Sequence, residues 1–323
     1  MDPVKIGMIK IPKTNSMFKA KQFLFSFLSL MLLSCSDNIS ENDRKIIFTV
    51  QDFLDNSDGL LTRTSLIDGS RFIWSESDTV GIYPNTGGQV YFAMEEGAGT
   101  SSATFDGGGW DFKPSAKYYS YYPFIGDIYL DRNRIPVSYI NQNQIAANDL
   151  SHIGAFDFMY TPATSADNGN LNFSYSHLSC IIRVTATLPA GVYTKMTIES
   201  PDKDFTVKGY YDLESTSPQI ISSEKNESLS ISLGDIESDG TTPVMIYMMS
   251  APVDMKGKII HVTFTNSNGI IYMQEKTPSV AYQAGAIGKL TCNSLTAVNS
   301  FADGVNSSDS PYGSDDEVIT INQ

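Results

Sequence analysis

The sequence predicts an all-β protein built from β-sandwiches. Beyond Lys45, β-branched and aromatic residues recur with a period of two, which is typical of strands with one buried face. Clusters of Gly, Asn, Asp and Pro separate these runs at even spacing, and only residues 141–150 carry a modest helical periodicity. Many short strands with so little helix favour sandwiches over a parallel sheet covered by helices.

The expected strands follow one another along most of the chain. They are residues 46–50, 71–74, 79–83, 90–94, 117–124, 156–160, 171–188, 192–200, 205–213, 228–233, 244–249, 258–264 and 270–274. Within 171–188 the apolar alternation changes parity near Ser176-His177, which predicts a bulge or a switch between sheets. The clearest hairpin lies around Asn268-Gly269, because this pair supplies the positive φ that tight turns need.

The start of the chain carries an export signal that ends in a lipidation pattern. Two lysines precede an apolar run at 23–33, and residues 32–35 read Leu-Leu-Ser-Cys. This run is roughly half of what a bilayer-spanning helix needs, so we expect it to be cut off. Translation is expected to start at Met17, residues 1–34 to be removed as the signal peptide, and Cys35 to be acylated. The alternative is an ordinary signal peptide with an incidental Cys35.

Composition divides the mature chain into three parts. A stretch rich in Ser, Ala, Asp, Asn and Gly at 164–170 separates two strand signals, and the chain becomes polar and acidic beyond Leu295. We therefore expect one sandwich domain at 35–168 and a second at 169–295. An acidic linker with one short strand follows at 296–323. That strand has nothing to pair with, and an isolated strand is unstable in water.

Charge and cysteine content limit the classes of partner. The net charge is −14 and the isoelectric point is about 4.5, so the surface repels phosphate backbones and we expect no nucleic-acid partner.

Cys180 and Cys292 both lie on the apolar parity of strand-like runs. Buried free cysteines are common, but an exported protein can also form a disulfide, so the sequence leaves their pairing open. No cysteine spacing indicates a metal site.

Residues for catalysis are scarce. The three histidines, His152, His177 and His261, fall in no metalloprotease or hydrolase motif. His177 precedes a core strand, so we expect a hydrogen-bonded structural residue rather than a catalyst. No nucleophile, base and metal set converges in the sequence. We therefore expect neither an enzyme, nor a cofactor, nor a metal.

Four segments, taken in order, resemble the fimbrillin family, the type V pilins of Bacteroides-like bacteria. They are Thr-Arg-Thr at 62–64, Phe-Ile-Trp-Ser-Glu-Ser-Asp-Thr-Val-Gly-Ile-Tyr at 72–83, Leu-Asn-Phe-Ser-Tyr-Ser-His-Leu at 171–178 and Tyr-Gln-Ala-Gly at 282–285. An aromatic residue that is usual just after the last motif is absent here. Acidic residues soon after Cys35 also resemble the signal that sends lipoproteins of these bacteria to the cell surface.

The resemblance implies a fold and an assembly route. The fold is two transthyretin-like, Ig-like Greek-key β-sandwich domains in tandem. A trypsin-like protease would cut after Arg63 and free the first strand, and the vacated groove would accept a donor strand from another subunit, which is β-augmentation. The candidate donor strand is formed by Val318, Ile319, Thr320 and Ile321. The alternatives are an uncut surface arginine and a disordered acidic tail.

Two functions follow as hypotheses. The first is a structural subunit of cell-surface fimbriae, exported as an outer-membrane lipoprotein and supporting adhesion. Its partners would be other fimbrial subunits, the outer membrane through the lipid, and receptors or glycans on host or bacterial surfaces. The second is a surface glycan-binding lipoprotein that uses exposed aromatic residues such as Trp110.

Overall fold

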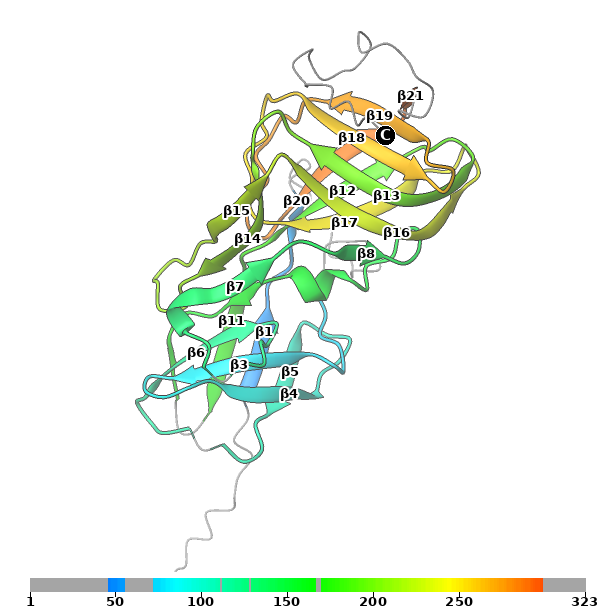
Figure 1. The fold of residues 1–323 in the computed structure, drawn as a ribbon. Helices are drawn as coiled ribbons and strands as arrows, with labels where there is room; N and C mark the ends of the chain where they lie inside the picture. Colours follow the sequence, from blue (N-terminus) through cyan, green and yellow to red (C-terminus); the bar gives the residue numbers. More distant parts are fainter. Residues whose placement is uncertain (1–45, 56–71, 111, 128, 167–169, 299–323) are drawn as a thin grey trace, which may run out of the picture. The chain divides into compact units, whose positions relative to one another are not determined.

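The protein is described from a computed structural model, which covers residues 46–55, 72–110, 112–127, 129–166 and 170–298. All of them belong to one compact unit, Asp43–Gln323. The helices in this part of the chain are two short 3₁₀ turns, η1 at Arg132–Arg134 and η2 at Ile153–Phe156. Strands in several sheets make up the rest of the regular structure, which confirms the all-β fold class (Figure 1).

The first sheet contains eight strands in the order β10-β6-β3-β4-β5-β1-β11-β9. Their bounds are Ile46–Val50 (β1), Thr79–Pro84 (β3), Val90–Glu96 (β4), Ser102–Asp106 (β5), Lys117–Tyr122 (β6), Met159–Tyr160 (β9), Thr164–Ser165 (β10) and Leu171–His177 (β11). Strand β9 pairs with β6 as well as with β11, so the ladder closes on itself. Strand β1, blue in Figure 1, therefore lies inside the ladder rather than at an edge.

Three further sheets are built mostly from residues after β11. A four-stranded sheet has the order β17-β12-β20-β2, a six-stranded sheet β21-β19-β18-β13-β16-β8, and a three-stranded sheet β15-β14-β7. The bounds are Leu54–Asp55 (β2), Ile135–Ser138 (β7), Gln142–Gln144 (β8), Cys180–Ala186 (β12), Gly191–Glu199 (β13), Phe205–Tyr211 (β14), Ile221–Asn226 (β15), Ser228–Ser238 (β16), Val244–Ser250 (β17), Ile260–Asn266 (β18), Ile271–Lys276 (β19), Ala286–Cys292 (β20) and Thr296–Val298 (β21).

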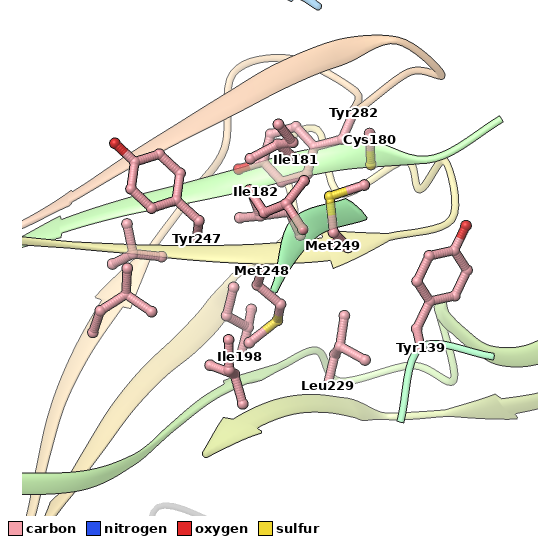
Figure 2. Close-up of a cluster of buried hydrophobic side chains, with 14 of the residues drawn as sticks. Tyr139, Cys180, Ile181, Ile182, Ile198, Leu229, Tyr247, Met248, Met249 and Tyr282 are labelled. Carbon is pink, nitrogen blue, oxygen red and sulfur yellow. The ribbon is translucent and has the colours of Figure 1, made fainter. Parts of the chain in front are cut away.

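The four-stranded and six-stranded sheets face each other across a shared apolar core. Ile182 of β12 and Met248 of β17 point toward Ile198 of β13 and Leu229 of β16 (Figure 2). All of these side chains are buried, with exposed fractions of 2% or less. Burying alternate apolar side chains of two sheets against each other is the arrangement of a β-sandwich.

A second buried cluster is formed largely by side chains of the first sheet and is rich in aromatic rings. It contains Phe48, Trp74, Phe105, Phe173 and Tyr175, all almost completely buried. Every buried member of this cluster lies between Phe48 and Tyr175 in the sequence. The described residues therefore bury two separate hydrophobic clusters.

Two local predictions are confirmed by the strand pairing. The run predicted at 171–188 switches sheets, because β11 ends at His177 in the eight-stranded sheet and β12 begins at Cys180 in the four-stranded one. The predicted hairpin exists as β18 and β19, which pair antiparallel. Its turn residue Gly269 has a φ of 78°, the conformation for which glycine is favoured.

Two other local predictions are wrong. Residues 141–150 form no helix; they include β8, which pairs with β16, and tertiary contacts override the weak helical pattern. The part of the expected strand 71–74 that the structure describes is not a strand either. Its backbone bonds to a loop instead, since Trp74 N donates to Thr100 O at 2.9 Å and Gly99 N donates to Trp74 O at 2.8 Å.

Candidate functional site: the slot that holds the first strand

Strand β1 lies between β5 and β11, and we call its position the β1 slot. Thr49 stands opposite Ser102 in the antiparallel pair with β5 and opposite Ser174 in the parallel pair with β11. Val50 N also donates to Ser101 O at 3.0 Å. Because β1 is bonded on both sides, its removal would expose the ladder edges of two strands that are now paired.

The inward face of β1 fills an aromatic pocket. Phe48 has no exposed surface, and its ring centroid lies 4.6 Å from that of Phe105, 5.2 Å from that of Phe173 and 6.1 Å from that of Tyr175. Val50 is also buried, whereas Thr49 points to solvent. The alternation is that of a strand with one face in the core.

The chain that leaves β1 is held by a buried histidine. His177 Nε2 lies 2.6 Å from the carbonyl oxygen of Gln51, and Nδ1 lies 2.8 and 2.9 Å from the two carboxylate oxygens of Asp157. A carbonyl oxygen can only accept, so Nε2 carries a proton and donates it to Gln51. A further proton lies between Nδ1 and Asp157. We refer to these two residues as the His177–Asp157 dyad, and it is complete only with both protons in place.

Burial and charge act in opposite directions on this dyad. Burial disfavours the charged imidazole, but the charge of Asp157 and the hydrogen bonds to Asp157 and Gln51 outweigh it, so the pKa of His177 lies above its ordinary value of 6.5. Burial also raises the pKa of Asp157, and His177 opposes that shift. Both raised pKa values mean that the dyad keeps its proton as the pH rises.

Beyond the dyad, the same segment joins a second sheet. The ring of Phe53 stacks on that of His177, with centroids 3.9 Å apart. Leu54 N then donates to Gly285 O at 2.6 Å, and β2 pairs in parallel with the start of β20. Gly285 belongs to the predicted Tyr-Gln-Ala-Gly motif and has a φ of 68°, so this motif makes the turn that receives the segment. Residues 46–55 are thus bonded to two different sheets.

Several residues predicted as functional lie outside the described part of the chain. They are Cys35, Arg63, Val318, Ile319, Thr320 and Ile321. Their roles stay predictions. Arg63 falls between the two described segments 46–55 and 72–110, so a cut there would separate β1 and β2 from the rest of the described chain.

The structure shows whether Cys180 and Cys292 form a disulfide. Cys180 and Cys292 are both buried and free. In the parallel pair of β12 and β20, Cys292 stands opposite Ala186, at the far end of β12 from Cys180. Six residues at 3.3 Å each place the two Cα atoms about 20 Å apart along the strands, far beyond the reach of a disulfide.

His177 is confirmed as a hydrogen-bonded structural residue, as its place beside a core strand predicted. Asp157 and Gln51 were not singled out from the sequence. The only available signal was the buried parity of His177 in β11, which requires a polar partner without naming it. Trp110 is 43% exposed and meets the condition for a surface contact.

Among the described residues, no three His, Cys, Asp or Glu side chains gather closely enough to hold a metal ion. Asp202 and Asp204, which are two residues apart in the sequence, are both bound by Lys258, at 3.1 and 2.7 Å. Within this part of the chain, no helix has the length and apolar character to span a bilayer.

Comparison with protein families identifies the chain's relatives. The profile of the fimbrillin-like family matches residues 62–300, which is most of the sequence. This chain belongs to the fimbrillin-like family. Membership confirms the function class predicted from the sequence, a structural subunit of cell-surface fimbriae that supports adhesion. No curated protein sequence is significantly similar to this fimbrillin-like chain.

Solved structures resemble the chain at low sequence identity. A putative cell adhesion protein from Bacteroides ovatus matches with a TM-score of 0.52 and 14% identity, over 79% of this chain and 95% of that one. A putative cell adhesion protein from Bacteroides fragilis matches with a TM-score of 0.43 and 11% identity, over 79% and 97%. The tip fimbrial protein Mfa3 from Porphyromonas gingivalis matches with a TM-score of 0.33 and 11% identity, over 72% and 81%. Only the first likeness bears on the fold of this fimbrillin-like chain.

Proposed function

We propose that this fimbrillin-like chain polymerises into fimbriae by donor-strand exchange. The supporting observation is that β1, an interior strand of the first sheet, is supplied by a short N-terminal segment with a fully buried Phe48. An interior strand that can be cut away leaves a long apolar slot with two unpaired edges. A strand from another subunit can fill such a slot, because backbone bonds give affinity and alternate side chains fill the pockets.

Cleavage after Arg63 is the proposed trigger. It would release residues 46–55, which hold both β1 and β2, and with them Cys35 and its lipid. The lipid would then hold a closed subunit at the outer face of the outer membrane until cleavage opens the slot. Val318, Ile319, Thr320 and Ile321 would form the strand that enters the slot of the next subunit. No enzymatic step is assigned to the chain itself.

The proposal includes the finer fold predicted from the sequence. Two tandem Greek-key sandwich domains with a boundary near residue 168 are supported by the two buried clusters. One cluster uses only residues from Phe48 to Tyr175, and the other is formed mainly by residues after His177.

Limited trypsin digestion of the chain from Ser36 onward tests the proposal, because the compact unit Asp43–Gln323 is retained in it. We expect cleavage at Arg63 to yield detergent-resistant ladders of polymer. The matched control lacks residues 303–323 and should be cut at the same site yet stay monomeric. Polymer from this truncated chain would refute the donor role of the tail. Polymer from an Arg63→Ala chain that is never cut would refute the trigger.

Glycan binding is a second candidate function, supported by the 43% exposure of Trp110 on a loop after β5. Its test is binding to a glycan array. Binding that is lost in Trp110→Ala, in a chain that never polymerises, would favour this function over the first.

A further inference from the structure

Hydrophobic pattern alone leaves the register of an incoming strand open. The pockets of the β1 slot alternate with a period of two, and so do Ile319 and Ile321 in the tail. A shift by two residues returns apolar side chains to the same face, and a strand of Ile-Thr-Ile pattern reads alike in both directions. Backbone ladder bonds are uniform along a strand and do not distinguish these arrangements.

The sequence of the tail matches β1 in one register. Residues 46–51 read Ile-Ile-Phe-Thr-Val-Gln, and residues 317–322 read Glu-Val-Ile-Thr-Ile-Asn. In this alignment Ile319 replaces Phe48, Thr320 replaces the exposed Thr49, and Ile321 replaces Val50. Asn322 then replaces Gln51, the residue whose carbonyl oxygen accepts from His177.

We propose that His177 sets the register and direction of the donor strand by donating its Nε2 proton to the backbone carbonyl of Asn322. This inference rests on the proposed function and adds a residue that selects one arrangement of the exchanged strand. The occupant is residues 317–322 of a second copy of this chain. The linker 299–316 extends to about 60 Å, which is ample reach between neighbouring subunits.

The dyad suits this role because it is a single fixed point. His177 is 7% exposed, and Asp157 is fully buried and fixes the ring through Nδ1. When the N-terminal segment leaves, the Nε2 proton loses its acceptor while Asp157 still holds the ring. Phe53 leaves with the same segment, so its ring no longer covers His177 in the empty slot. An incoming strand that covers His177 again without offering a carbonyl leaves the Nε2 donor buried and unpaired, so a strand that supplies a carbonyl at this point is preferred over one that does not.

Cysteine cross-linking reads the register directly. The acceptor carries Asn172→Cys, lacks residues 303–323 and is cut at Arg63. Asn172 is exposed and stands opposite Ile47, which the alignment replaces by Val318. The donor is left uncut, so that its own slot stays filled, and carries one new cysteine at Val318, Thr320 or Asn322. The native Cys180 and Cys292 are buried and do not compete.

Each donor reports one arrangement. Val318→Cys cross-links in the proposed register, Thr320→Cys in a strand shifted by two residues, and Asn322→Cys in a reversed strand. We expect Val318→Cys to be preferred by roughly tenfold, the ratio expected from one charge-assisted hydrogen bond. Preference for either of the other two donors overturns the inference.

Two acceptor variants test the role of His177. His177→Gln/Asp157→Asn keeps an N–H donor and should keep the preference, whereas His177→Phe/Asp157→Asn removes the donor and should abolish it. An unchanged preference in the second variant, checked as folded by its cooperative unfolding, overturns the inference. If no donor cross-links and no polymer forms with the unmodified chain, the proposed function itself fails.

The pH dependence of the cross-linking preference tests the role of His177 without replacing it, so a misfolded variant cannot affect the result. The preference for Val318→Cys should fall as the pH rises from 6 to 9. Over this range the dyad loses one of its two protons, and Nε2 then no longer donates to the Asn322 carbonyl while Nδ1 stays bonded to Asp157. Asp157 faces the ring, Tyr122 of β6 interacts with Asp157, and Asp52 leaves with the cut segment. Phe53, which stacks on His177, carries no charge and also leaves with the cut segment, and Phe72, whose ring centroid lies 6.0 Å from that of His177, is uncharged. A preference that does not change with pH contradicts the inference.

Discussion

At the scale of single residues, the His177–Asp157 dyad joins the N-terminal segment to the rest of the protein. It replaces water around two buried ionisable groups with one ion pair and one bond to a backbone carbonyl. Removing one member alone leaves the other charge buried without its partner, which typically costs about 3–5 kcal/mol of stability. Paired replacements such as His177→Gln/Asp157→Asn avoid that penalty and isolate the effect of the proton.

The dyad predicts a loss of stability at alkaline pH. The pKa of His177 is raised in the folded state, so its contribution is complete below 6.5 and is lost as the pH rises through the folded pKa. The raised pKa of Asp157 acts in the same direction. We expect the free energy of unfolding in urea to fall by up to about 1.4 kcal/mol per pH unit in that window. His177→Gln/Asp157→Asn should remove this slope, and equal slopes in both proteins would contradict the assignment.

The sequence predicted that His177 is a hydrogen-bonded structural residue, but not its partners. Gln51 lies 126 residues away in the sequence and Asp157 lies 20 away. Nothing local to the histidine specifies either contact, because both depend on how β1, β11 and η2 come together. The disulfide question was open for the same reason, since it depended on the register of β12 and β20.

At the scale of elements, β8 connects two sheets through its side chains. Its backbone pairs with β16, while the amides of Gln142 and Gln144 bond to the backbone of β17. Gln142 accepts from Met249 N at 2.7 Å and donates to Met249 O at 2.8 Å. Because β17 is the last strand of its sheet, these amides take the place of a neighbouring strand at its edge.

Gln142→Leu should therefore destabilise the fold. It leaves the buried N–H and C=O of Met249 without side-chain partners, so we expect a loss of about 1–3 kcal/mol in the free energy of unfolding, measured in urea. Asn143→Leu is the matched control, because Asn143 lies between the two glutamines and is exposed. Equal losses in the two variants would show that the glutamine bonds to β17 do not matter.

These contacts also explain which elements the sequence could predict. Long alternating runs such as β11 and β12 were recognised, and even their sheet switch was visible as a change of parity at Ser176-His177. β8 was missed because Gln142 and Gln144 are polar residues buried by contacts with a distant strand. Trp74 was mistaken for a strand residue because its apolar spacing reflects the aromatic core rather than a ladder.

At the scale of the whole molecule, one short segment contributes to two sheets. Residues 46–55 supply an interior strand to the first sheet and an edge strand to the sheet of β12, β17 and β20. The sequence predicted the β1 strand itself, and cleavage at Arg63 after it stays a prediction. It gave no sign that the same segment also pairs with β20, since β2 is only two residues long.

The mass of the subunits in assembled fimbriae tests the central claim most directly. Fimbriae sheared from cells should be dissociated and their subunits weighed intact, with the cell-bound precursor as the reference. We predict that assembled subunits begin at Thr64, so that Cys35, its lipid and β1 are all missing, while residues 318–321 are retained. Assembled subunits that still contain the lipidated Cys35 and residues 46–50 would contradict strand exchange at the β1 slot.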